Sequence, residues 1–231
     1  MARASERLAG IRQRIAAAAL RAGRDPAAIE LLAVSKTFPA EAVAELFAAG
    51  QRSFAESRQQ EAEGKLALVP GGIDWHFIGH LQRNKVRKVL EAFRTLHSVD
   101  SLRLAEHVEA VARDLGVRPD IYLQVNIAGE PSKHGFAPAE LRDAIKPLKQ
   151  LTQVRIAGLM AIPPEEEDPE HARRWFAALR DLRDELAGAA GIDLPGLSMG
   201  MSGDFEIAIE EGATVVRVGS AIFGERSYPA P

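Results

Sequence analysis

The 231-residue sequence contains no cysteine. Disulfide frameworks, thiol nucleophiles and zinc sites with cysteine ligands are therefore excluded. No apolar run approaches the roughly 20 residues that cross a bilayer, and neither sign of charge dominates, since the formal net charge is −3. A weakly acidic chain lacks the general electrostatic attraction that captures nucleic acid. We expect a soluble, cytoplasmic protein with no membrane or nucleic-acid partner, whose chemistry depends on side chains other than thiols.

A short apolar run followed by an amphipathic helical stretch recurs along the whole chain. The eight apolar runs cover residues 31–35, 52–55, 75–78, 95–99, 121–125, 155–160, 196–199 and 214–218. Helical stretches lie between them at residues 41–49, 57–66, 81–92, 102–115, 138–151, 171–187 and 204–211. Several runs are almost wholly apolar, which is typical of parallel strands covered on both faces. This alternation predicts an α/β fold, a single (β/α)8 TIM-type barrel domain that spans residues 1–231.

A doubly wound open sheet is the alternative fold for such a pattern. That sheet normally carries a glycine-rich turn directly after its first strand. Here the first apolar run leads into the segment KTFP at 36–39, which contains no glycine. We therefore prefer the barrel.

The N-terminal residues 1–24 are rich in arginine and alanine, with Leu8, Ile11 and Ile15 at helical spacing. One interpretation is an extra N-terminal helix that packs its apolar stripe on the barrel. The other is a transit peptide, which is also amphipathic, rich in arginine and poor in acids. Gly23 fits the end of a helix, and we favour the packed helix.

Functional groups of a barrel gather at the C-terminal ends of its strands. Lys36 is unusual there because it directly follows a continuous apolar strand, with no acid beside it in the sequence. An amine at the lip of a barrel is partly desolvated, which favours its neutral form and its attack on a carbonyl. The alternative is a lysine that extends its charged head to solvent. The complete ring of strand-end residues is Lys36, Glu56, Ser57, Gly79, His80, Asp100, Ser101, Asn126, Met160, Ser202, Gly203, Gly219 and Ser220.

Arg217 lies inside the apolar run 214–218, and alternation places it on the same side of the strand as Val215. A guanidinium in an apolar strand is rarely buried without a partner. It either meets a ligand or pairs with a carboxylate such as Glu56 or Asp100.

Small residues follow the last two strands, at 198–203 and 219–221. They let backbone N–H groups approach an anion, and the loops after strands seven and eight often bind phosphate in barrels. The alternative is that Ser202 caps a helix whose first turn carries Asp204 and Glu206. An amine, a planar cation and a phosphate cradle together suggest pyridoxal 5′-phosphate.

Six segments in a fixed order are distributed along the chain from residue 31 to residue 226. They are LLAVSKTFP at 31–39, WHFIGHLQRNK at 75–85, GEPSKHGF at 129–136, GLMAIP at 158–163, LSMGMSGDFEIAIEEGAT at 197–214 and VRVGSAIFGER at 216–226. Together they resemble the pyridoxal phosphate homeostasis protein family, a barrel similar to the N-terminal domain of alanine racemase. The resemblance implies that Lys36 forms a Schiff base with pyridoxal 5′-phosphate, the vitamin B6 coenzyme. It also implies that Ser202, Gly219 and Ser220 hold the phosphate.

The same resemblance places Arg217 opposite the pyridine nitrogen. An arginine there disfavours protonation of the ring, so the coenzyme is a poorer electron sink. We also place Ser57, His80 and Met199 in the cofactor site, although Ser57 stands where the family usually has an asparagine. We expect that changing Ser202 or Arg217 to Ala weakens coenzyme retention and leaves the fold intact, because both are expected at a loop-lined mouth.

Three functions fit these features. The first is a carrier that holds the coenzyme on Lys36 for homeostasis, and the second is a racemase-like enzyme that uses Lys36 as its base. A two-base racemase needs a proton donor on each face of the coenzyme. Alanine racemase supplies the second donor from a tyrosine, and neither Tyr122 nor Tyr228 matches its position. We expect a monomeric carrier without turnover, with coenzyme-dependent apo-enzymes as partners; a phosphate-binding barrel that forms no imine is the third possibility.

We expect no metal site. His76 and His80 flank a strand end, but no third ligand stands at a motif-like spacing. The basic residues between 83 and 88 fit a solvated helix face better than a nucleic-acid patch, given the net charge of −3.

Overall fold

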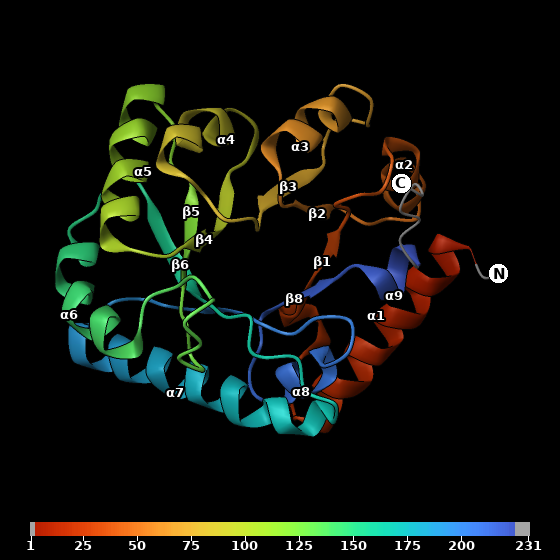
Figure 1. Ribbon diagram of the computed structural model, residues 1–231. Helices are drawn as coiled ribbons and strands as arrows, with labels where there is room; N and C mark the ends of the chain where they lie inside the picture. The colour runs from red at the N-terminus through yellow and green to blue at the C-terminus, as the bar shows by residue number, and fades with distance from the viewer. Residues whose placement is uncertain (1–2, 225–231) are drawn as a thin grey trace.

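Eight parallel strands close into a barrel in the computed structural model, which describes residues 3–224 (Figure 1). Each strand pairs with the next along the chain, and the last returns to the first, where Ala33 is the partner of Val218. The barrel predicted from the sequence is confirmed, and the doubly wound sheet is excluded. The strands are β1 (Glu30–Val34), β2 (Ser53–Glu56), β3 (Asp74–Phe77), β4 (Thr95–Val99), β5 (Asp120–Gln124), β6 (Arg155–Met160), β7 (Gly196–Ser198) and β8 (Val215–Val218).

Helices surround the barrel as an outer layer (Figure 1). Between the strands lie α2 (Ala40–Ala48), α3 (Gln59–Leu66), α4 (Val86–Ala92), α5 (Leu102–Leu115), α6 (Pro138–Lys149), α7 (Arg173–Ala190) and α8 (Phe205–Glu210). A short helix that the sequence did not predict, α9 (Ser220–Phe223), follows β8. Short 3₁₀ turns are η1 (Pro26–Ala28), η2 (Arg83–Lys85) and η3 (Pro169–Ala172), and the last two replace the first turns of two predicted helices. No helix among residues 3–224 is long and apolar enough to cross a membrane.

Alternation along the strands produces two apolar layers, one inside the barrel and one between the barrel and the helices. On β8, Val215 belongs to the inner layer, while Val216 and Val218 belong to the outer layer. Arg217 therefore lies on the inner side of its strand, as the sequence predicted. The inner layer consists of Leu32, Val34, Ala55, Tyr122, Ala157, Met160 and Val215.

Helix α1 (Ala4–Arg21) lies along the outside of the barrel against α8 and α9 (Figure 1). It buries Leu8, Ile11 and Ile15 against the barrel wall, so the packed N-terminal helix is confirmed. The arginines of α1 also contact α8 and α9. Arg7 donates to the carbonyl oxygen of Ile222 at 2.5 Å, and Arg14 forms an ion pair with Glu206 in α8. These contacts give the arginine-rich composition a structural role.

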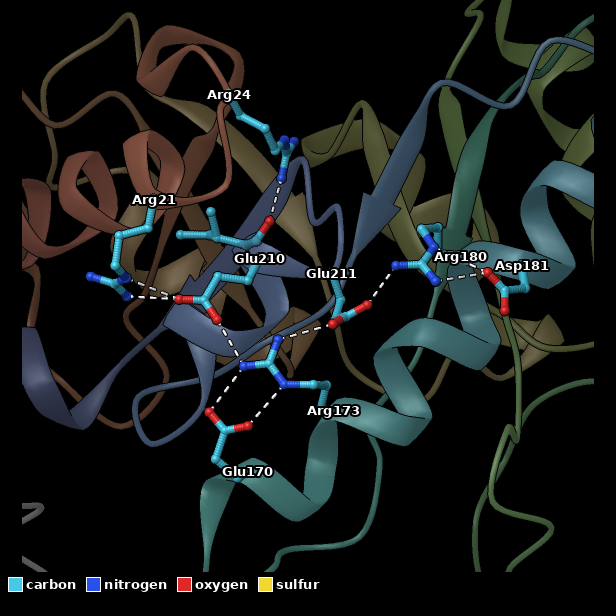
Figure 2. Close-up of polar contacts among 9 residues, drawn as sticks. Arg21, Arg24, Glu170, Arg173, Arg180, Asp181, Glu210 and Glu211 are labelled. Carbon is cyan, nitrogen blue, oxygen red and sulfur yellow. Dashed lines mark hydrogen bonds and ion pairs between the residues drawn. The ribbon is translucent and has the colours of Figure 1, made fainter.

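A cluster of ion pairs ties the C-terminal end of α8 to α1 and α7 (Figure 2). Arg173 contacts Glu210 at 2.8 Å and Glu211 at 2.9 Å, and Arg21 of α1 contacts Glu210 at 2.9 Å. The hydrogen bond from Arg173 is the largest cause that lowers the pKa of Glu210. The cluster thus joins α8, which begins three residues after Ser202, to α1 and α7.

Candidate functional site at the mouth of the barrel

Lys36 is half-buried and lies two residues beyond the end of β1. Lys65 in α3 donates hydrogen bonds to the carbonyl oxygen of Ser35 at 2.7 Å and to the carboxylate of Glu61 at 2.9 Å. Glu61 in turn accepts a hydrogen bond from the backbone N–H of Thr37. The residues on both sides of Lys36 are therefore held by the same ion pair. Thr37 has a φ of 70°, a left-handed conformation that is costly for a β-branched residue.

The buried carboxylate of Glu56 holds the residue before Lys36 in this turn. Oε1 of Glu56 accepts hydrogen bonds from the Ser35 hydroxyl and from Nζ of Lys65, both at 2.7 Å. Burial raises the pKa of Glu56, although the hydrogen bonds from Lys65 and Ser35 act in the opposite direction. Its Oε2 atom has no hydrogen-bond partner among the described residues. The expectation that Glu56 could pair with Arg217 is wrong: β2 extends one residue further than predicted, so Glu56 points outward with Phe54, under α3.

The Ser202 hydroxyl lies among hydrogen-bond donors at the start of α9. The backbone N–H groups of Gly219 and Ala221 both point at its oxygen from 3.4 Å, and the Ser220 hydroxyl lies 3.3 Å away. The three N–H and O–H groups converge on one position. An oxygen-rich anion beside the Ser202 hydroxyl would find these donors close together.

The alternative role for Ser202, as the cap of α8, is not observed. Asp204 occupies the position before α8, and its Oδ1 accepts a hydrogen bond from the backbone N–H of Met201 at 2.6 Å. Burial raises the pKa of Asp204. Glu206 is turned toward Arg14 of α1. Asp204 and Glu206, the two acids near these donors, therefore have other partners.

Lys36 and the small-residue loop after β8 lie at adjacent strand ends. β1 and β8 are parallel neighbours, with Ala33 beside Val218, so the residues that follow them leave the barrel side by side. A Cβ atom on Gly219 would lie 3.3 Å from the carbonyl oxygen of Val34, which shows how closely this loop passes β1. β7, which precedes Ser202, is the other neighbour of β8. Three chain segments that are distant in sequence thus form one side of the mouth.

Arg217 is 4% exposed and donates to two uncharged acceptors inside the barrel. Its guanidinium contacts the Ser198 hydroxyl at 2.8 Å and the carbonyl oxygen of Ala161 at 2.9 Å. The predicted carboxylate alternatives are not its partners, since Glu56 binds Lys65 and Asp100 faces two histidines. Burial lowers the pKa of Arg217 to about 10. The guanidinium therefore remains charged at neutral pH.

A chain of buried polar groups continues from Arg217 across the barrel. Arg217 can only donate, so the Ser198 hydroxyl accepts from it and has its own hydrogen available for Nδ1 of His97 at 2.8 Å. His97 then donates from Nε2 to Nδ1 of His76 at 2.9 Å, and His76 donates from Nε2 to Asp74 at 3.2 Å. Burial lowers the pKa of His97 well below its ordinary value, so this ring is neutral. Every donor along the chain then has an acceptor, and sequence reasoning missed the chain entirely.

Ser57 and His80 both lie at the mouth of the barrel, where the C-terminal ends of the strands meet the loops. Ser57 is half-buried just beyond β2, and the backbone after β3 passes so close that a Cβ on Gly79 would lie 1.9 Å from its carbonyl oxygen. His80 follows this contact, is exposed, and stacks on His134 with ring centroids 3.9 Å apart.

Met199 directly follows β7, but its side chain does not face the mouth. Met199 has no exposed surface, and its side chain belongs to the apolar layer between the barrel and the helices. Its backbone N–H donates to the carbonyl oxygen of Val215 at 3.1 Å. A direct contact of this side chain with a ligand would require the outer layer to open.

Comparisons with known proteins show the family. The sequence profile described as alanine racemase, N-terminal domain, matches residues 7–227. A pyridoxal phosphate homeostasis protein from Pseudomonas aeruginosa is 48% identical over 233 residues, which cover 100% of this chain and 99% of that protein. A protein of the same name from Escherichia coli K12 is 44% identical, with 96% of each chain covered. The solved structure of PipY from Synechococcus elongatus with PLP bound has a TM-score of 0.85 and 42% identity, covering 96% of this chain and 100% of PipY.

The chain belongs to the pyridoxal phosphate homeostasis protein family. Proteins of this family share their barrel with much longer enzymes. Alanine racemase from Clostridium difficile 630 matches with a TM-score of 0.70 and 19% identity, covering 87% of this chain and 56% of the racemase. At this identity the likeness extends to the fold alone.

Tyr122 does not occupy a position in this homeostasis-family barrel from which it could act as a proton donor at the mouth. It lies inside the barrel and is stacked on His97 with centroids 4.5 Å apart. Burial, the largest cause, raises the pKa of Tyr122 to about 12. Tyr228, the other tyrosine considered, and the end of the last family motif, Arg226, lie outside the described residues.

Proposed function

We propose that this protein binds pyridoxal 5′-phosphate covalently through Lys36 and carries it as part of coenzyme homeostasis. The observation that carries the proposal is that Lys36 and the anion donors of Gly219–Ala221 follow two adjacent parallel strands, β1 and β8. It is supported by PipY, a relative with 42% identity whose structure has PLP bound. We further propose that the protein acts as a monomer in the cytoplasm, where apo-enzymes that need the coenzyme are the acceptors.

The residues present fit a phosphate group. The N–H groups of Gly219 and Ala221 lie 3.4 Å from the Ser202 hydroxyl, which is longer than the usual 2.9–3.0 Å of a good N–H···O bond. Phosphate oxygens facing these donors would accept stronger, charge-assisted hydrogen bonds. The hydroxyl groups of Ser202 and Ser220 would add two further donors. The absence of a side chain on Gly219 keeps the backbone accessible, because it lies close to β1.

Lys36 and Arg217 would act on the other parts of the coenzyme. Its aldehyde would supply an electrophilic carbon, which the Lys36 amine would hold in a covalent bond that water can reverse. The pair Lys65–Glu61 holds the residues on either side of Lys36 and so fixes the position of the amine. Arg217 stays charged at neutral pH and would oppose protonation of a pyridine nitrogen beside it. This arrangement favours storage of the coenzyme over carbanion chemistry.

The covalent link is tested by reduction and mapping. Protein incubated with pyridoxal 5′-phosphate is treated with borohydride, digested, and analysed by mass spectrometry for the site of the adduct. We expect one adduct per chain, on Lys36, and none on Lys36→Ala. Lys133→Ala is the matched control, because Lys133 is an exposed lysine of a mouth loop and its loss should change nothing. An adduct distributed over several lysines, or unchanged in Lys36→Ala, contradicts the proposal.

The absence of turnover is tested separately. The loaded protein is incubated with L-alanine in deuterated water, and α-deuterium and the D-isomer are measured over time. We expect no more exchange than with Lys36→Ala mixed with free coenzyme. Sustained exchange that depends on Lys36 would show that the protein is an enzyme.

Transfer of the coenzyme from the loaded protein is measured by adding a coenzyme-free acceptor enzyme and following recovery of its activity.

A further inference from the structure

Three side chains with metal-ligand chemistry converge at the mouth, on the loops after β3, β4 and β5. Nδ1 of His80 lies 3.6 Å from Oδ2 of Asp100, and Nδ1 of His134 lies 3.9 Å from the same oxygen. The ligand atoms of all three residues lie within 4.8 Å of one another. The three positions are 20 to 54 residues apart in sequence, so only the closed barrel brings them together.

These separations are too long for hydrogen bonds, which span about 2.7–3.2 Å. They are close to the spacing of two ligand atoms on one metal ion, about 3.3–3.4 Å for a tetrahedral site with bonds of about 2.0–2.1 Å. Asp100 is 16% exposed and its other oxygen, Oδ1, accepts a hydrogen bond from the Ser101 hydroxyl, so Oδ2 is the atom presented to the histidines. The rings of His80 and His134 are 45% and 59% exposed and have room to close by a few tenths of an ångström.

Although the sequence alone led us to expect no metal site, we propose that His80, Asp100 and His134 form a binding site for a zinc-type divalent cation. Two imidazoles and one carboxylate suit Zn²⁺ and its analogue Co²⁺ better than Mg²⁺ or Ca²⁺, which prefer oxygen ligands. Three protein ligands leave a coordination position open. A cavity of about 180 Å³, lined by His80 and His134 together with Gln124 and Asn126, provides space for a water molecule or a small oxygen ligand at that position.

A second group of possible ligands serves as an internal comparison. Glu30, Asp74 and His76 lie at the N-terminal end of the barrel with ligand atoms within 4.8 Å. This group offers one imidazole, and both ring nitrogens of His76 are already engaged, one by His97 and the other by Asp74. The mouth site offers two imidazoles whose facing nitrogens make no hydrogen bond to Asp100 at the observed distances. Cation binding should therefore occur at the mouth.

The test uses the coenzyme-free full chain without a polyhistidine tag. Co²⁺ is added and its visible d–d absorption recorded, and Zn²⁺ binding is measured by calorimetry; the absence of cysteine removes thiolate ligands from the interpretation. We expect one ion per chain. His80→Gln and His134→Gln should each weaken Zn²⁺ binding by more than about tenfold, since losing a ligand costs at least as much as losing an outer hydrogen-bond partner. Circular dichroism verifies that each variant is folded.

Three further variants locate the ion. His171→Gln, an exposed histidine on η3, is the matched control and should bind Zn²⁺ like the original protein. Lys36→Ala should also bind normally, which separates this proposal from the function proposed above. Asp74→Asn should have no effect, because the ion is not at the N-terminal end. Binding that survives both mouth substitutions, binding lost in Asp74→Asn, or no binding of either ion at 100 μM (roughly a 5.5 kcal/mol limit) overturns the assignment.

Discussion

Nζ of Lys65 lies 2.7 Å from Oε1 of Glu56, and neither side chain is more than 8% exposed. The pair lies behind the turn that presents Lys36, with Lys65 also bound to the carbonyl oxygen of Ser35. A buried pair of this kind does not by itself show high stability, because both charges were taken out of water. Its effect here, together with Glu61, is to fix the backbone on either side of Lys36.

Removal of the positively charged Lys65 side chain should destabilise the fold. In Lys65→Met the buried Glu56 carboxylate loses its partner, and breaking such a pair costs roughly 3–5 kcal/mol. We expect the free energy of unfolding, measured in urea, to fall by about that amount. Lys88→Met, an exposed lysine on α4, is the control and should change stability by less than about 0.5 kcal/mol. Equal stability of the two variants would contradict the role assigned to the pair.

Glu56 should also leave a signature in the pH dependence of stability. Its pKa is raised in the folded protein, mainly by burial, so the folded state binds a proton more readily than the unfolded state. Stability contributed by this group therefore decreases as pH rises through the window between the unfolded and folded pKa values, and recovers as pH falls. Urea unfolding of the original protein and Glu56→Gln is compared between pH 7 and pH 5. We expect the original protein to gain stability relative to Glu56→Gln toward pH 5, and the reverse trend would refute the raised pKa.

Ser202→Ala should weaken coenzyme binding with little change in stability. The variant loses one hydroxyl donor to the phosphate, and a hydrogen bond to a charged group contributes about 1.5–3 kcal/mol, or about tenfold or more in affinity. Affinity is measured from the absorption of the bound coenzyme during dialysis. Ser5→Ala in α1, on the outside of the barrel, is the control. Retention equal to that of the control would remove Ser202 from the phosphate cradle.

Arg217→Ala requires a different expectation from the one that the sequence suggested. Arg217 is buried inside the barrel, and its loss would leave the Ser198 hydroxyl and the Ala161 carbonyl oxygen without their donor. We expect a loss of about 2–4 kcal/mol in unfolding free energy in addition to weaker coenzyme binding. Calorimetric melting of the coenzyme-free variant measures the first effect alone. An unchanged melting temperature would contradict the buried hydrogen bonds.

The order of hydrogen bonds inside the barrel predicts the tautomers of two histidines. His97 should be neutral with its hydrogen on Nε2, and His76 should accept at Nδ1 and carry a hydrogen on Nε2, because Arg217 and Ser198 determine the direction of donation. Long-range ¹H–¹⁵N correlation spectra of the imidazole rings distinguish the two tautomers. His97→Phe should change the His76 spectrum, whereas His107→Gln on α5 should not. A hydrogen on Nδ1 of His97 would show that Ser198 accepts from both neighbours.

The sequence was sufficient for the barrel because each strand and helix has a local pattern. Apolar runs such as 214–218 mark strands covered on both faces, and the alternation within that run correctly placed Arg217 on the same side as Val215, which the structure shows to be the inner side. The predicted first residues of two helices were less accurate, because the 3₁₀ turns at 83–85 and 169–172 have sequences that resemble the start of an α-helix.

The partners of the polar residues could not be predicted, because they depend on strand register and helix facing. Because β2 ends one residue later than predicted, the side chain of Glu56 faces α3 and not the mouth of the barrel. A signal was available: Lys65 lies on the same face of its helix as the buried Gln59 and Ala62, where an unpaired lysine would be costly. The chain from Arg217 to Asp74 joins four strands, and no local motif reveals it.

The pairing of β1 with β8 has a consequence for how the protein matures. Lys36 and Ser220 lie far apart in the sequence, and the pairing of β8, the last strand of the described residues, with β1 brings their chain segments together. A nascent or truncated chain that lacks β8 holds the amine without its anion cradle. Under the proposed function, stable binding of the coenzyme would therefore require the closed ring of strands.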